Sequence, residues 1–368
     1  MIEFFIWYLL LFISYFFILF LYMHFSNKKV FYENLFGFAG LSIVFFNVLL
    51  FLNLMFQDST LHSLTLPLFL ISLGLPILSF LIITCISSLI YIILKFGIKS
   101  QIFTRYKESM FARFSKRSKL RNDIYRKLAH VLIFIGLFVL WYIGAFIVKN
   151  ISGSTEGMIP YEDNMLYLYI RIFIEPNSFN DVLFSLGWFY YLLFFFFYSF
   201  TILMFSIEFT RKTKYLSSPF NFICAIYLCD DEEEGYGAYL YFTLGQMFAS
   251  FICPPMVFLA ILGISSIADL MTSQVGIRVG KHKVKFNSNK SWEGAIAGCI
   301  TSFIICIFFL GLVWAMIFTF IFFIIDIITK KPINISDNLL IPMLCAIVYV
   351  IVSFFLAIDY TTIFLIWI

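Results

Sequence analysis

Long uninterrupted apolar runs constrain this chain more than any other feature of its sequence. Residues 2–25, 30–56 and 181–207 each contain one acidic residue and no Lys or Arg. Each run reaches the roughly 20 residues that a helix needs to cross a hydrocarbon core of about 30 Å. Of the 368 residues, 62% are hydrophobic and 12% are charged, whereas about 25% are charged in a soluble domain. The sequence therefore predicts an all-α, polytopic integral membrane protein surrounded by the lipid bilayer.

Several other protein classes are excluded by the same inspection. The first run carries Glu3, has no basic residue before its apolar part and has no small-residue cleavage site, which predicts a retained helix rather than a signal peptide. The seven cysteines are scattered without a Cys-x-x-Cys pair, so neither a zinc site nor a disulfide framework is indicated. The net charge of +4 gives no reason to expect a nucleic-acid partner.

Basic residues are concentrated in loops, and this predicts the orientation of the chain. Eleven of the 25 Lys and Arg residues fall in 95–127, so this loop is expected to be cytoplasmic. Working outward from it, 128–148 crosses to an acidic far-side loop at 149–181, and 182–207 returns. A second basic loop, 274–293, is also expected to be cytoplasmic.

The remaining apolar runs bring the total to about ten transmembrane helices. A Pro254-Pro255 break separates two short helices at 236–253 and 256–271, while 294–328 suits two tight crossings and 339–358 the last one. The exact number stays open at 64–97 and 294–328. We divide the chain into an N-terminal three-helix membrane segment (1–98), a basic cytoplasmic loop (99–127) and a catalytic transmembrane domain (128–368).

Charged side chains at the ends of apolar runs indicate where function is located, because they are costly inside a bilayer. Arg126, Lys127 and His130 share one face of a helix that enters the membrane. The two cations alone could instead extend toward lipid head groups. Glu208 and Arg211 stand three residues apart at the end of another run and could form an ion pair.

Two carboxylates are candidates for binding a cation. Asp269 lies late in the apolar segment 256–271, where a carboxylate needs a partner, and Mg²⁺ is the obvious candidate. Asp337, followed by Asn338, stands at the start of the last span. Taken alone, Asp337 could simply cap that helix.

The loop between these carboxylates suits a polyphosphate. Its glycines allow close approach of a ligand, and its lysines and the following helix N-terminus favour negative charge. The residues concerned are Gly276, Gly280, Lys281, Lys290, Ser291, Glu293 and Gly294. The loop is not a Walker A motif, because the glycine spacing is one residue short and His282 stands in place of Ser or Thr.

In this order, the motifs resemble the polytopic family of dolichol, phytol and other polyprenol kinases, to which CTP-dependent diacylglycerol kinases are related. The resemblance covers about residues 120–358 and rests on Arg126-Lys127-x-x-His130, Glu208-x-x-Arg211, Asp269 before Gly276-x-x-x-Gly280, Lys290-Ser291-Trp292-Glu293-Gly294 and Asp337-Asn338-x-x-x-Pro342. It implies transfer of the γ-phosphate of CTP to the hydroxyl group of a membrane lipid alcohol at the cytoplasmic face.

Roles then follow from charge, because phosphoryl transfer requires positioning and charge neutralisation. Asp269 and Asp337 are expected to hold Mg²⁺, and His130 or a carboxylate is expected to accept the hydroxyl proton. The candidate catalytic residues are Arg126, Lys127, His130, Glu208, Arg211, Asp269, Lys290, Glu293 and Asp337. The candidate nucleotide-binding residues are Gly276, Gly280, Lys281, Lys290, Ser291, Gly294 and Asn338.

The sequence departs from the family pattern at one position and resembles a second family more distantly. A Glu often precedes the Asp-Asn pair in the kinases, whereas the nearest upstream carboxylate here is Asp326. Phosphatidate cytidylyltransferase shares the Lys-Ser-Trp-Glu-Gly element, but Ser336 replaces a lysine of its C-terminal motif and no His-Gly-Gly follows. That enzyme, a CTP-dependent diacylglycerol kinase and a non-catalytic transporter or lipid-binding scaffold are the alternatives.

Overall fold

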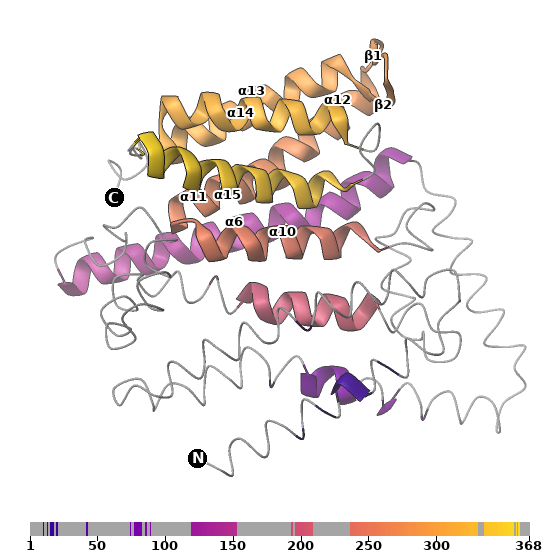
Figure 1. Ribbon diagram of the computed structural model, residues 1–368, viewed down its shortest axis with the longest axis vertical. Helices are drawn as coiled ribbons and strands as arrows, with labels where there is room; N and C mark the ends of the chain where they lie inside the picture. Colours follow the sequence, from indigo (N-terminus) through magenta and orange to yellow (C-terminus); the bar gives the residue numbers. More distant parts are fainter. Residues whose placement is uncertain are drawn as a thin grey trace, which may run out of the picture. The chain divides into compact units, whose positions relative to one another are not determined.

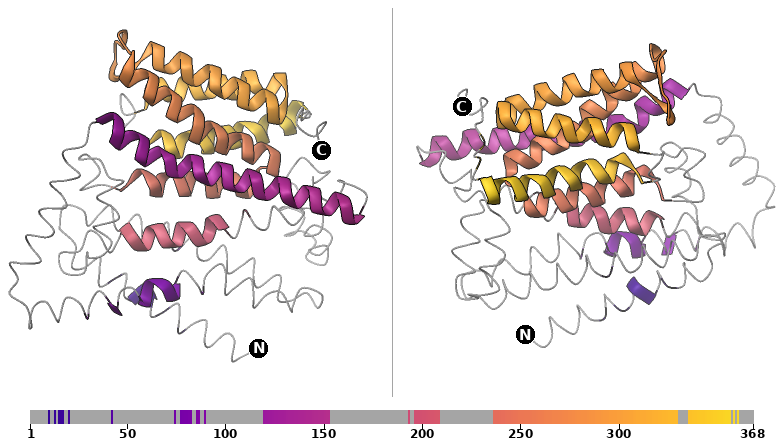
Figure 2. Two further views of the ribbon diagram at one scale, coloured as in Figure 1. Left: turned by 180° about the vertical axis from the view of Figure 1, so that it is seen from behind. Right: turned by 45° about the horizontal axis from the view of Figure 1, so that its top comes forward.

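The computed structural model describes residues 119–152, 196–208, 236–329 and 335–356, together with isolated positions elsewhere. The chain forms two compact units, Met1–Ser118 with Tyr198–Leu240, and Lys119–Phe197 with Tyr241–Ile368. The predicted N-terminal helices, most of the basic loop 99–127 and the acidic loop 149–181 lie largely outside the described residues. The second unit contains most of the described helices and is shown in Figures 1 and 2.

Helix α6, Lys119–Ser152, is longer than the predicted crossing 128–148. Its helical hydrogen bonding begins within the basic segment, so Arg126 and Lys127 are both helical residues. Helix α10, Ala238–Ile252, matches the predicted segment 236–253.

The chain then turns at Cys253-Pro254 and enters a nearly unbroken helical segment. Helix α11 is Pro255–Gly263, with proline at the position where its missing N–H costs no helical bond. A π-helical stretch, Ile264–Ala268, leads into α12, Asp269–Arg278. The predicted end at residue 271 was therefore wrong, because regular hydrogen bonding continues to Arg278 and places Gly276 inside the helix rather than in a loop.

A short β-hairpin follows α12, where the sequence predicted only a loop. Strands β1, Lys283–Val284, and β2, Asn287–Ser291, are antiparallel, with Lys283 opposite Ser291 and Val284 opposite Asn287. Val284 is buried against Ala295 and Ile327 while its neighbours are exposed. The all-α prediction is thus correct for the helical elements but missed this hairpin, because a two-residue strand has too few residues for an alternating pattern.

Three helices complete the described part of this unit. Helix α13 is Trp292–Leu310 and α14 is Leu312–Ile328, joined by Gly311 alone. Gly311 has φ 84°, a conformation that glycine adopts without steric cost. The segment 294–328, for which the sequence predicted two tight crossings, therefore contains two helices. Helix α15, Asp337–Leu356, begins two residues before the predicted crossing.

The core of the unit is formed around α11, which is buried along its entire length. Such a helix is expected at the centre of a helical bundle. Phe134 on α6 contacts Phe309 on α13 edge to face, and Trp314 on α14 lies 4.9 Å from Tyr349 on α15 between ring centroids. These contacts hold α6, α13, α14 and α15 around the central helix (Figure 2).

Four of the described helical segments are long and apolar enough to cross a membrane. They are Asp123–Ile147, Pro255–Arg278, Trp292–Leu310 and Asp337–Leu356. Shorter apolar helices are Phe196–Glu208, Ala238–Ile252 and Leu312–Ile328. Apolar side chains such as Phe320, Phe354 and Phe355 are exposed on these helices, as expected for a surface in contact with lipid. The structure therefore supports the prediction of a helical membrane protein.

Candidate functional site

Lys127 and Asp269 form a buried ion pair between α6 and α12. The Nζ atom of Lys127 lies 2.7 Å from Oδ1 of Asp269, and both side chains are 6% exposed. The same ammonium donates to the backbone carbonyl of Asp269 at 2.8 Å and to Oγ of Ser273 at 2.7 Å. Lys127 therefore uses all three donors on the first turn of α12. The expectation that Asp269 needs a cationic partner is met by a lysine from another helix.

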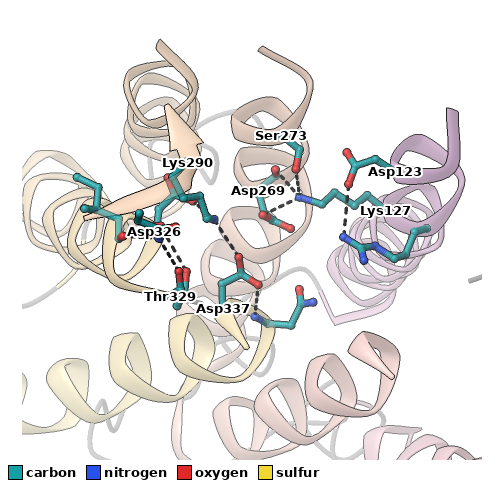
Figure 3. Close-up of polar contacts among 12 residues, drawn as sticks. Asp123, Lys127, Asp269, Ser273, Lys290, Asp326, Thr329 and Asp337 are labelled. Carbon is teal, nitrogen blue, oxygen red and sulfur yellow. Dashed lines mark hydrogen bonds and ion pairs between the residues drawn. The ribbon is translucent and has the colours of Figure 1, made fainter. Parts of the chain in front are cut away.

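Lys290 on β2 forms the second ion-pair group. Its Nζ atom lies 2.6 Å from Oδ1 of Asp326 on α14 and 3.1 Å from Oδ2 of Asp337 on α15. Figure 3 shows the ammonium of Lys290 between these two carboxylates. Burial opposes the charge of Lys290, but Asp337, Asp326 and Asp269 together raise the pKa of Lys290 above its ordinary value. Lys290 is thus held as a cation.

The two groups are neighbours and form what we call the charged cluster: Lys127, Asp269, Lys290, Asp326 and Asp337. Asp269 interacts electrostatically with Asp337 and Lys290 as well as with Lys127. The cluster contains three carboxyl groups and two ammonium groups. Five elements, α6, α12, β2, α14 and α15, supply one member each.

A π-helical turn directly precedes the carboxylate in the centre of this cluster. The hydroxyl groups of Ser265 and Ser266 donate to the carbonyls four residues earlier, Ile261 at 2.9 Å and Leu262 at 2.5 Å. These bonds satisfy the carbonyls where the regular pattern changes. Insertions of this type are frequent at functional sites, since the extra residue reorients the side chains that follow.

His130 lies one turn beyond Lys127 on α6, as the sequence predicted. Its ring stacks on Phe242 of α10 with centroids 3.8 Å apart and an angle of 5° between the planes. The side chain is buried, and its Nδ1 atom has no hydrogen-bond partner in the described part of the chain. His130 interacts electrostatically with Lys127, Arg126 and Asp337, so the predicted grouping of Arg126, Lys127 and His130 is present.

Arg126 belongs to a smaller group beside the cluster. Its Nη2 atom is 3.4 Å from Oδ1 of Asp123, one turn earlier on α6. The other oxygen of Asp123 accepts a hydrogen bond from Nε2 of Gln274 on α12 at 3.0 Å. Asp123 therefore connects the predicted cation Arg126 with α12.

Glu293 secures the turn that precedes the hairpin. Its Oε1 atom accepts from the backbone N–H groups of Lys281 at 3.2 Å and His282 at 3.0 Å, and lies 2.6 Å from Nδ1 of His282. The carboxylate is therefore engaged in holding the turn against the start of α13. A direct catalytic role of Glu293 stays a prediction.

The glycines of the predicted phosphate loop allow α12 and α13 to approach each other. A Cβ atom on Gly294 would lie 2.7 Å from the carbonyl oxygen of Thr272 and 3.1 Å from Cα of Gly276. A Cβ atom on Gly280 would lie 2.5 Å from Oγ of Ser291. These positions are filled by protein atoms, so the absence of side chains here serves helix packing.

Two backbone amides at the start of α13 are likewise already paired. The N–H group of Trp292 donates to the carbonyl of His282 at 2.9 Å. The N–H group of Gly294 donates to Oγ of Ser291, the N-cap residue, at 3.3 Å. The expected phosphate cradle is therefore less open than the sequence suggested, because these two amides already have protein acceptors.

Three further predicted site residues are Glu208, Arg211 and Asp337. Glu208 belongs to the other compact unit, where it is buried and accepts from the N–H group of Gly237 at 3.0 Å. Its predicted partner Arg211 lies outside the described residues. Asp337 is the first residue of α15; its Oδ1 accepts from the N–H group of Asn338 at 3.0 Å, while its Oδ2 binds Lys290.

No group of three or more His, Cys, Asp or Glu side chains in the described ranges is arranged to bind a metal ion. Asp269 and Asp337, the predicted Mg²⁺ ligands, are each paired with a lysine. The Oδ2 atom of Asp326 is buried and has no hydrogen-bond partner among these residues.

Asp326 was not among the predicted site residues, although it could stand in from within the helix for the Glu that often precedes the Asp-Asn pair. Its side chain is 2% exposed and forms the shorter of the two bonds to Lys290. The rule that selected Asp269, a carboxylate inside an apolar run, applies equally to Asp326. Ser273 and Gln274 were missed because neutral polar residues at a helix end carry no comparable signal.

Comparisons of the chain with family models, with curated proteins and with solved structures found no match.

Proposed function

We propose that this protein is a kinase that transfers the γ-phosphate of CTP to the hydroxyl group of a membrane lipid alcohol such as a polyprenol. The observation that carries the proposal is the charged cluster, in which residues from five separate elements meet at one end of a bundle of apolar helices (Figure 3). The motif order gives the reaction type, and the cluster supplies the charges that such a reaction requires.

The position of the cluster suits a substrate that stays in the bilayer. The N-terminal end of α6 and the hairpin lie at the same end of the helical bundle in both views of Figure 2. These are the two basic segments for which the positive-inside rule predicts the cytoplasmic side. A nucleotide approaching from water would meet there an alcohol whose chain lies among the helices.

Each charged residue has a role in this proposal. Lys290 and Lys127 neutralise the phosphate groups of CTP, and Lys281, which is exposed on the adjoining turn, adds a further cation. Asp269 and Asp337 would hold Mg²⁺, with Asn338 assisting, and the ion would neutralise charge on the triphosphate. Lys127 and Lys290, which bind these carboxylates in the structure, would then bind the phosphate groups instead.

The reaction itself forms one bond and breaks one. The alcohol oxygen bonds to the γ-phosphorus while the bond from this phosphorus to the oxygen shared with the β-phosphate breaks, which releases CDP and the lipid monophosphate. The hydroxyl proton passes to a base. His130 is the best-placed candidate, because it is close to Asp337 and its Nδ1 atom is without a protein partner in the described ranges.

The finer topology is also part of the proposal. We propose about ten transmembrane crossings with the charged cluster at the cytoplasmic face. Single cysteines introduced into 99–127 and 149–181 of a cysteine-free variant would be labelled by a membrane-impermeant maleimide from opposite sides of sealed vesicles. Labelling of both loops from one side would contradict this topology.

The test of activity uses the full chain purified in detergent, CTP labelled at the γ-phosphate, and a panel of prenols and diacylglycerol. We expect label in the lipid and CDP as the by-product. Asp269→Asn and Asp326→Asn should lower kcat about a hundredfold, because each substitution removes a charge from the site and loss of one preorganised electrostatic group has effects of this size. Asn150→Ala, at the opposite end of α6, is the matched control and should leave turnover unchanged.

Three results would contradict the proposal in different ways. Near-normal turnover of Asp269→Asn would remove this residue from the metal role. Release of pyrophosphate with transfer of CMP to phosphatidate would identify a cytidylyltransferase. Absence of nucleotide turnover with every lipid would favour a transporter or scaffold.

A further inference from the structure

We propose that Gln246 on α10, together with His130 on α6, binds the hydroxyl group of the lipid alcohol. This inference rests on the proposed function and identifies the part of the site that receives the phosphate acceptor. It concerns a residue that neither the sequence motifs nor the charged cluster includes.

Both side chains have unpaired polar atoms in the interior of the second unit. Gln246 is 0% exposed, and neither its Oε1 nor its Nε2 atom has a hydrogen-bond partner among the described residues. His130 is 5% exposed, and its Nδ1 atom also has no hydrogen-bond partner among these residues. Buried amides are normally hydrogen-bonded, because loss of water without replacement is costly. Two such side chains on facing helices indicate a missing polar ligand.

Helix periodicity places Gln246 close to His130. Phe242, Gln246, Ala249 and Cys253 follow one another at spacings of four, three and four residues, and all are buried, so they form one face of α10. Gln246 is the one polar residue of these four, and Thr243 and Ser250, three residues before it and four after it, are also buried. His130 stacks on Phe242, so Gln246 lies about one helical turn, roughly 6 Å, from the residue that His130 contacts.

A second contact places this pair beside the charged cluster. Gly245, the residue before Gln246, packs against the start of α15, where an added Cβ atom would lie 2.8 Å from the carbonyl oxygen of Asn338. Asn338 directly follows Asp337, and His130 interacts electrostatically with Asp337. The turn of α10 that carries Gln246 therefore packs against the start of α15, where Asp337 lies, and His130 interacts with that same carboxylate.

The chemistry of these groups favours a neutral alcohol over a phosphorylated lipid. A hydroxyl group is one donor and two acceptor sites, and a glutamine amide offers one acceptor and two donors that match it. Gln246 carries no charge to balance a phosphate monoester. Because both side chains are almost completely enclosed, entry of the alcohol requires movement of the packed side chains around them.

The experiment replaces Gln246 with Leu and, in a second variant, with Met, in the full chain in detergent. Binding of a diazirine-labelled polyprenol is measured by photocrosslinking without nucleotide, and KM for the alcohol and for CTP is measured separately. Thr319→Val is the matched control, since it removes a buried hydroxyl on α14 that has no partner in the described ranges. We expect both Gln246 variants to weaken alcohol binding and raise its KM about tenfold, equivalent to one hydrogen bond, with KM for CTP unchanged.

A thermal measurement separates binding from folding. Without alcohol, Gln246→Leu should unfold at the same or a higher temperature than the wild type, because it removes an unpaired buried amide. Added polyprenol should raise the melting temperature of the wild type and of Thr319→Val more than that of Gln246→Leu.

The outcomes distinguish this inference from the proposed function. If the wild type phosphorylates a polyprenol and both Gln246 variants keep its KM, the inference is overturned and the kinase proposal stands. If polyprenol binding depends on Gln246 while no phosphate is transferred, the kinase proposal is overturned and the inference stands. If the wild type binds no lipid alcohol, both are overturned.

Discussion

The ammonium of Lys127 donates to both the carboxylate and the backbone carbonyl of Asp269, at 2.7 and 2.8 Å. The two residues are 142 positions apart in the chain, so this contact joins α6 to the helix that contains the central carboxylate of the charged cluster. A buried ion pair between distant helices has two possible purposes, since it can stabilise the fold and it can position a functional group. These purposes are separable by experiment.

We expect Lys127→Met alone to destabilise the protein by about 3 to 5 kcal/mol, because Asp269 is left as a buried charge without its partner. The double variant Lys127→Met/Asp269→Leu should recover most of this stability, since an apolar pair of similar volume replaces the ion pair. It should nevertheless lack CTP turnover. Thermal unfolding in detergent and the γ-phosphate assay measure the two effects on the same samples. Recovery of both stability and activity in the double variant would assign the pair a structural role only.

Lys290 should remain charged at every pH at which the protein can be assayed. Its folded-state pKa is raised above the ordinary value, so its contribution to stability is complete below the unfolded-state pKa, near 10.4, and is lost only as pH rises through the higher folded-state pKa. We therefore expect the difference in melting temperature between the wild type and Lys290→Met to stay constant from pH 7 to about 9.5. Lys283→Met, at an exposed position in the same hairpin, is the control and should have little effect at any pH. A difference that shrinks between pH 7 and 9 would mean that Lys290 loses its proton early.

Gly294→Ala should destabilise the junction of α12 and α13 by about 1 to 3 kcal/mol, the usual effect of overpacking. The added methyl group would lie 2.7 Å from the carbonyl oxygen of Thr272, which is backbone and cannot rotate away. Gly136→Ala is the matched control on α6, where nothing lies within 4 Å of the new atom. Because alanine favours helices by up to about 1 kcal/mol over glycine, the control should be neutral or slightly stabilising in a thermal melt. Equal effects of the two substitutions would show that packing at Gly294 is unimportant.

Asn287 attaches the hairpin to the end of α14, so substitution of Asn287 should destabilise both elements. Its Nδ2 atom donates to the carbonyls of Ile327 at 2.8 Å and Thr329 at 2.7 Å, and the side chain is buried. Asn287→Asp replaces this donor with a carboxylate facing two carbonyl oxygens, so we expect a loss of about 1 to 3 kcal/mol. Asn289→Ala, at an exposed position of the same strand, is the control and should change stability by less than about 0.5 kcal/mol. Hydrogen exchange of the amides in β2 would locate the effect. Unchanged protection of β2 in Asn287→Asp would contradict the attachment.

Much of the helical organisation was predictable, because the cost of exposing backbone polar groups to lipid leaves few structures for a long apolar run. The segments at 128–148, 236–253 and 339–358 correspond to α6, α10 and α15 with shifted ends. The end at residue 271 was wrong because the polar residues after it still complete helical hydrogen bonds. The hairpin was missed because β1 has only two residues, too few to show an alternating pattern.

The sequence by itself determined which residues are costly in lipid and therefore require partners, since charge and hydropathy are properties of each residue and its neighbours. It identified Lys127, Asp269, Lys290 and Asp337 without showing how they pair. Only the tertiary structure decided that Lys127 binds Asp269, and that Lys290 joins Asp337 to Asp326. The same holds for the glycines at 276, 280 and 294, which the structure uses for helix packing. The physical reason is that an ion pair and a close helix contact depend on distances of a few ångströms between distant segments, and packing of the whole bundle sets those distances.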